Sequence, residues 1–102
     1  MADPPKTVGD PAQILTVEIR GKLIAVEFVH HAMDRMKERG IGVEDVLTCI
    51  RFPDEKGLPA DQGRHRVRRW NKEGSRALDV IYELVDGQCL RVITALWKSG
   101  RG

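Results

Sequence analysis

The sequence has no apolar run that approaches the roughly 20 residues needed to cross a bilayer as a helix. Its N-terminal residues are acidic and contain proline, and they lack the basic and hydrophobic segments of a signal peptide. We therefore expect a cytoplasmic protein with no membrane contact. Glycine-rich phosphate loops, Walker motifs, nucleophile elbows and HExxH zinc motifs are also missing. Nothing in the sequence therefore supports a nucleotide triphosphatase, a serine hydrolase or a metalloprotease.

Cysteine is scarce as well, with only Cys49 and Cys89 in the chain. The two do not form a close pair, and each falls within a predicted regular element. We therefore expect buried, reduced thiols and no disulfide. The histidines, His30, His31 and His65, add no Cys-x-x-Cys or His-x-x-x-His spacing. We expect neither a metal site nor a cofactor.

The 102 residues, of which 41% are apolar and 31% are charged, fit one domain with a modest core. Prolines and a glycine without apolar periodicity predict a flexible tail over residues 1–13, and polar residues predict a second tail over 98–102. The single domain is expected over residues 14–97. No repeat or low-complexity tract divides it.

The first half of the domain predicts strands followed by two helices. β-Branched and apolar residues over 14–19 and 23–28 predict a hairpin, or a single strand over the second run. A helix over 31–39 should end at Gly40, because glycine tolerates a positive φ. The second helix begins at residue 43 and is predicted by apolar residues with i, i+3, i+4, i+7 spacing, which are Val43, Val46, Leu47 and Ile50. Proline stops this helix at residue 53.

The second half of the domain predicts three strands, over 64–70, 77–85 and 89–97, with a turn at Asp86-Gly87 between the last two. Strands, two helices and further strands in this order describe an α+β domain. We expect the three later strands to form an antiparallel β-meander packed on the pair of helices. The opposite face of the sheet would then be free to bind a ligand.

The first predicted helix carries a possible site on its polar face. His31 and Arg35 lie one turn apart, roughly opposite Ala32 and Met36. An imidazole exchanges protons near neutral pH, and a guanidinium holds a phosphate through two parallel hydrogen bonds. The pair is therefore either part of a phosphodiester-handling site or a solvated face in which Arg35 pairs with a nearby acid.

The strand predicted over 64–70 is strongly basic, since residues 64–76 contain six lysines and arginines against the single acid Glu73. Alternation places Arg64, Arg66, Arg68 and Trp70 on one face, and His65, Val67 and Arg69 on the other. Cations beside an aromatic ring suit single-stranded RNA, although such arginines also keep exposed edge strands from aggregating. Thr94 interrupts an apolar strand, so its hydroxyl is either bonded within the core or exposed in a cleft.

Several short segments spread over the domain form a recognisable pattern. They are His31-Ala32, Arg35-Met36, Arg39-Gly40-Ile41, Asp45-Val46, Pro53, Arg64 to Trp70, Leu78 to Tyr82 and Val92-Ile93-Thr94. In this pattern the chain resembles a bacterial family, the domain of unknown function 4258 family, over about residues 28–97. This family is similar in turn to the small ribonuclease toxins of the RelE, barnase and colicin type. Those toxins place helices before an antiparallel sheet and often cut RNA without a metal.

The resemblance implies a metal-independent endoribonuclease toxin, in which the RNA 2′-hydroxyl attacks the adjacent phosphate. His31 would be the general acid or base, with His65 as its substitute. Arg35 and Arg66 would stabilise the charged transition state, and Thr94 would orient phosphate or water. RNA would be bound by the strand residues Arg64, His65, Arg68, Arg69 and Trp70. The alternative is a non-catalytic module whose basic sheet binds RNA or a protein partner such as a cognate antitoxin.

Overall fold

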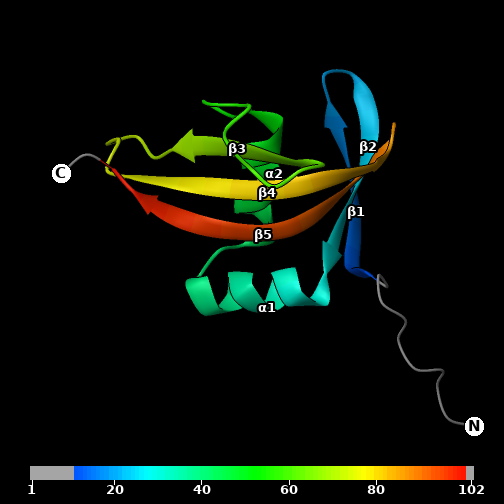
Figure 1. Cartoon of the computed structure of the whole chain (residues 1–102), viewed down its shortest axis with the longest axis horizontal. Helices are drawn as coiled ribbons and strands as arrows, with labels where there is room; N and C mark the ends of the chain where they lie inside the picture. The colour runs from blue at the N-terminus through cyan, green and yellow to red at the C-terminus, as the bar shows by residue number, and fades with distance from the viewer. Residues whose placement is uncertain (1–10, 101–102) are drawn as a thin grey trace, which may run out of the picture.

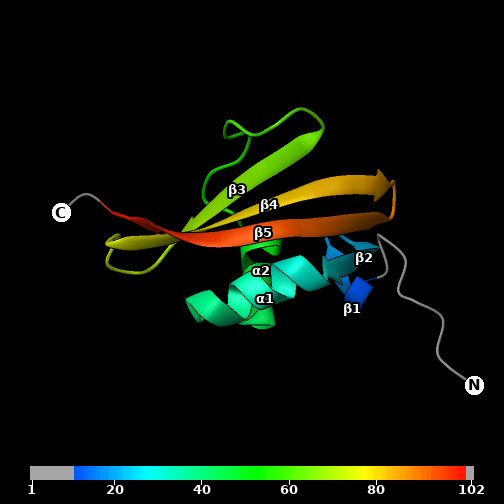
Figure 2. The same cartoon turned by 60° about the horizontal axis from the view of Figure 1, so that its bottom comes forward.

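A computed structural model describes residues 11–100, with side chains from residue 13 onward, and shows two helices on one side of a five-stranded sheet (Figures 1 and 2). The elements in chain order are β1 (Pro11–Ile19), β2 (Lys22–Val29), α1 (His30–Arg39), α2 (Val43–Arg51), β3 (Arg64–Trp70), β4 (Arg76–Asp86) and β5 (Cys89–Ser99). Most of the tail predicted over 1–13 and the end of the tail predicted over 98–102 lie outside the described residues. Residues 11–13 of the first predicted tail belong to β1, and residues 98 and 99 of the second belong to β5.

The sheet is larger than the predicted antiparallel meander, and it is mixed. Its strand order is β1-β2-β5-β4-β3, with β2 and β5 parallel and all other neighbours antiparallel. The prediction of three antiparallel strands, separate from an N-terminal hairpin, is therefore wrong, although the domain remains α+β. The physical reason is the connection after β2. The two helices carry the chain back across the sheet, so that β5 can lie beside β2 in the same direction.

The core lies between the sheet and the two helices. Every second residue of the central strands points toward the helices, and most of these residues beneath the helices are buried. From the sheet the core takes Val26, Phe28, Val67, Leu78, Val80, Leu90, Val92 and Ala95, and from the helices Ala32, Met36, Val46, Leu47, Cys49 and Ile50. The chain turns between the helices at Gly40, whose φ of 67° confirms the predicted helix end.

Helix α1 lies along the part of the β5 edge that β2 does not cover (Figure 1). The pairing of β2 with β5 ends at Val92. Beyond that point, Arg39 Nη1 donates to the Ala95 carbonyl at 2.8 Å and to the Thr94 hydroxyl at 3.2 Å. In return, Trp97 Nε1 donates to the Arg39 carbonyl at 2.8 Å. The end of α1 therefore satisfies polar groups that an open sheet edge would leave to water.

Both cysteines are free thiols, in agreement with the sequence, but only Cys49 is buried. Burial raises the pKa of the Cys49 thiol to about 12, and its Sγ lies 3.4 Å from the Leu78 carbonyl, to which it donates a weak hydrogen bond. Cys89 stands partly exposed at the start of β5. Cys49 is therefore an inert part of the core at neutral pH.

The two phenylalanines of the chain provide a matched test of the core. Phe28 on β2 is fully buried, whereas Phe52 after α2 is 56% exposed. Phe28→Ala should lower the free energy of unfolding by about 3 to 5 kcal/mol, because it leaves a cavity beneath the helices. Phe52→Ala should lower it by less than about 1 kcal/mol. Urea unfolding followed by circular dichroism measures both values, and equal losses would contradict this placement of the core.

Candidate functional site

The face of the sheet opposite the helices, here called the outer face, gathers several predicted site residues into rows. Thr94 on β5 is paired with Ile81 on β4, which is paired with Arg66 on β3. In the neighbouring row, Asp79 on β4 is paired with Arg68 on β3. Two strand spacings amount to about 10 Å, so Thr94 and Arg66 flank one short stretch of surface.

The centre of the outer face is a carboxylate held between two arginines. The Asp79 side chain is fully buried, and Arg66 Nε donates to its Oδ2 at 2.7 Å. Arg66 Nη2 forms an ion pair with the same oxygen at 2.6 Å. Arg68 donates from Nε to Oδ1 at 2.6 Å and from Nη2 to Oδ2 at 2.9 Å. Burial alone would raise the pKa of the Asp79 carboxyl, but the hydrogen bonds from both guanidinium groups outweigh it and hold that pKa below its usual range.

This cluster of Asp79, Arg66 and Arg68, here called the arginine clamp, keeps one net positive charge. The arginine side chains remain 22% and 19% exposed, so the clamp is partly open to solvent. The sequence-based reasoning missed Asp79. The signal available was a single acid between apolar residues of a strand next to an arginine-rich strand.

The loop over residues 52–63 neutralises much of the basic strand β3. The backbone groups of Glu55 and Arg68 bond to each other at 2.9 and 3.0 Å along the outer edge of β3. The Glu55 carboxylate accepts a hydrogen bond from Trp70 Nε1 at 2.6 Å, and the Asp54 carboxylate accepts one from the Trp70 backbone N–H at 2.7 Å. This loop contains three acids and one lysine. The local positive charge is therefore smaller than residues 64–76 alone suggest.

The residues predicted to bind nucleic acid lie on two sides of the sheet. Arg64 shares the outer face with the arginine clamp, and the Trp70 ring lies 5.9 Å from the Arg68 guanidinium carbon. His65 points to the helix side, where it stacks on Tyr82 with ring centres 5.3 Å apart. Arg69 lies on that side too, since its Nη1 donates to the Phe52 carbonyl at 2.6 Å. One surface thus collects only part of the predicted set.

His31 and Arg35 are exposed on α1, about two turns and one turn before Arg39 respectively. Spacing of four residues places all three along one side of the helix, and the bond from Arg39 to Thr94 indicates that this side borders the β5 edge. Arg35 Nη1 bonds to the Glu38 carboxylate at 3.1 Å. Between residues 13 and 100, no hydrogen bond or ion pair connects His31 or Arg35 to the sheet.

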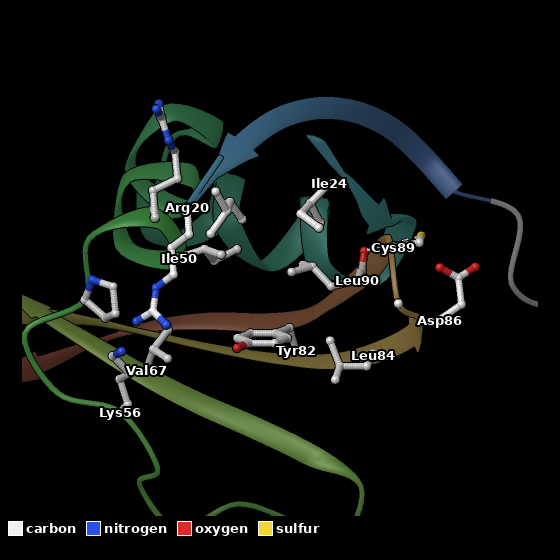
Figure 3. Close-up of a pocket in the computed structure, with 14 residues that line it drawn as sticks. Arg20, Ile24, Ile50, Lys56, Val67, Tyr82, Leu84, Asp86, Cys89 and Leu90 are labelled. Atoms are coloured by element: carbon white, nitrogen blue, oxygen red, sulfur yellow. Dashed lines mark hydrogen bonds between the residues drawn. The ribbon is translucent and has the colours of Figure 1, made fainter. Parts of the chain in front are cut away.

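A concave surface lies on the helix side of the sheet (Figure 3). It is a groove of about 290 Å³ between the end of α2, the β1–β2 hairpin, the end of β4 and the start of β5. None of the predicted catalytic residues lines it. Across the part of the chain that the structure describes, no group of three or more His, Cys, Asp or Glu side chains could hold a metal ion. In the same part, no helix is long and apolar enough to span a bilayer.

Removal of the clamp carboxylate should destabilise the domain in a pH-dependent way. Asp79→Asn should lower the free energy of unfolding at pH 7 by about 2 to 4 kcal/mol, since it leaves two partly buried guanidinium groups without their counter-charge. The pKa of Asp79 is lower in the folded state than in the unfolded state, where it is about 3.9. The contribution of the carboxylate to the free energy of unfolding is therefore complete above the unfolded pKa and is lost as the pH falls through the folded pKa.

The difference between wild type and Asp79→Asn should therefore be constant above about pH 5 and shrink below about pH 4. Urea unfolding at a series of pH values measures this difference. Asp61→Asn is the control, because the Asp61 carboxylate is exposed and its ion pair with Arg64 is long, at 3.8 Å. The loss of this weak pair should have little effect on stability. A difference that stays constant down to pH 2 would contradict the role assigned to Asp79.

Comparison with known proteins identifies the family of the chain. The family described as "Domain of unknown function (DUF4258)" matches residues 28–97, which run from the end of β2 through α1, α2, β3 and β4 into β5. Comparisons with curated proteins and with solved structures gave no significant match. The matched range contains the arginine clamp, Thr94 and the polar side of α1, and it covers well over half of the sequence. The chain belongs to the DUF4258 family.

Proposed function

We propose that this domain binds single-stranded RNA in the cytoplasm, across the outer face of its sheet. The observation that carries the proposal is the arginine clamp. Asp79 holds two guanidinium groups in fixed orientations, and both arginine side chains remain partly exposed. N–H groups that remain outside the clamp can donate to a phosphate with charge-assisted hydrogen bonds. Trp70 beside Arg68 adds a ring on which an unpaired base can stack.

Cleavage of the bound RNA is a second candidate function, and the position of α1 favours it. Arg39 reaches Thr94 at the end of the row that contains Arg66. RNA that follows this row passes the polar side of α1, where His31 and Arg35 stand. His31 would then take the proton of the 2′-hydroxyl as its oxygen bonds to the phosphorus, the P–O5′ bond would break, and solvent water would protonate the departing 5′-oxygen. Arg35 would leave Glu38 to stabilise the phosphate. A nuclease of this kind would act as a toxin of the RelE type and be held inactive by an antitoxin partner.

Binding is tested with a fluorescently labelled single-stranded RNA in EDTA, by fluorescence anisotropy. Wild type should bind with an affinity that falls steeply as salt increases. Arg66→Gln should weaken binding about tenfold at low salt, because it removes one charged phosphate donor. It should also reduce the slope of log affinity against log salt by about 0.7.

The matched control for this measurement is Arg91→Gln on the same face. Arg91 is already paired with two carboxylates, Glu27 at 3.1 Å and Glu83 at 3.3 Å, so its loss should leave the affinity within about twofold. Equal losses for both variants would mean that the clamp plays no special part. If wild-type protein does not bind RNA at low salt, the proposed function is wrong.

Cleavage is tested by incubating wild type, His31→Ala and Arg35→Ala with long RNA in EDTA and separating the products by size. If the domain is a nuclease, wild type should cut the RNA, and His31→Ala should cut it about a hundredfold more slowly or worse. Arg35→Ala should be slowed while it still binds. If wild type binds the RNA but leaves it intact, the domain is a binding module and the nuclease candidate fails.

A further inference from the structure

The groove on the helix side has an apolar floor that four elements build. Ile24 of β2, Ile50 of α2, Leu84 of β4 and Leu90 of β5 line it together with the ring of Tyr82 (Figure 3). Ile50 and Leu90 are buried, whereas Leu84 is 59% exposed. Within the described part of the chain, the side of the groove at Leu84 is therefore open to solvent. A concave, largely apolar surface of this kind is typical of a small-molecule site.

Charged side chains lie at the two ends of the groove and differ in sign. The first end carries Arg20 from the β1–β2 turn, Arg51 from the end of α2 and Lys56 from the loop before β3. Asp86 lies at the opposite end, beyond Leu84 (Figure 3). The groove therefore has one positive end and one negative end, with apolar side chains between them.

Two of the three cations are available to a ligand. Arg51 Nε donates to the Glu18 carbonyl at 3.1 Å, which holds the side chain beside the hairpin. Arg20 and Lys56, by contrast, form no ion pair with any acid among residues 13–100. Their charges are thus not neutralised locally, and they attract an anion to this end of the groove.

The size of the groove suits a small ligand. Its volume is about 290 Å³. Sites for small molecules begin at about 300 Å³. A compact ligand therefore fits this space.

We propose that the groove binds a small amphiphilic anion, with its acidic group at Arg20 and Lys56 and its apolar body against Leu84 and Leu90. This site is separate from the proposed RNA surface, because it lies on the helix side of the sheet and shares no residue with the arginine clamp. Ligand binding there and RNA binding on the outer face can therefore succeed or fail independently.

The test uses two fluorescent probes that share one aromatic body. The first, 1-anilinonaphthalene-8-sulfonate, carries an acidic group, and the second, N-phenyl-1-naphthylamine, does not. The folded full-length chain should bind the sulfonate at one saturable site. The double variant Arg20→Gln/Lys56→Gln should bind the sulfonate about three- to tenfold more weakly and the uncharged probe unchanged. Arg51 stays in place in this variant, because it also holds the hairpin.

A pair of neighbouring residues on β4 supplies the matched control. Leu84 lines the groove, whereas Val85, which follows it and is 45% exposed, does not. Leu84→Asp should weaken both probes at least tenfold, because it puts a charge on the apolar floor. Val85→Asp should change neither by more than about twofold. Thermal unfolding, with circular dichroism as the readout, verifies that each variant is folded at the assay temperature.

Amide chemical shifts of the wild type locate the bound sulfonate. The largest changes should occur at Ile24, Leu84 and Leu90, and the outer face should be unaffected. Three results would overturn the proposal. They are no saturable binding of the sulfonate, equal binding by Leu84→Asp and Val85→Asp, and loss of the two cations with no effect on the sulfonate. The last result would identify the groove as a merely apolar patch.

Discussion

The parallel pairing of β2 with β5 is the constraint on which the rest of the domain depends. A parallel neighbour cannot be reached through a tight turn, so the chain between the two strands must cross the sheet, and here α1 and α2 begin that crossing. Both helices therefore lie on one face, and the other face is left without a covering layer (Figure 2). The outer face, and with it every function proposed for that face, follows from this one pairing.

Local signals in the sequence were sufficient for the elements but not for their assembly. The i, i+3, i+4, i+7 spacing of α2, the glycine that ends α1 and the alternation in β3 all depend on neighbours in the chain, and the structure contains each of them. The pairing of β2 with β5 joins segments more than sixty residues apart in register, as Phe28 opposite Val92 shows. Long-range pairing of this kind depends on the whole topology, which one sequence does not reveal.

The sequence predicted which residues of β3 share one face, but not the net charge around them. Alternation correctly placed Arg66, Arg68 and Trp70 on one face of β3. A count of charges along 64–76 could not include Asp79 or Glu55, because both carboxylates come from other segments. The groove on the helix side escaped prediction for a related reason, since it is built from the ends of elements that meet only in the folded chain.

The buried Asp79 carboxylate also reduces the conformational entropy that the arginine side chains would lose if a ligand bound at the outer face. A free arginine side chain loses about 2 kcal/mol of rotamer entropy when a ligand immobilises it. In this domain Arg66 and Arg68 are immobilised by Asp79, so most of that loss belongs to folding and occurs before any ligand arrives. If the proposed function holds, the outer face is in consequence a rigid receptor. It would then select ligands whose phosphates already match its spacing, because its arginines are fixed by Asp79.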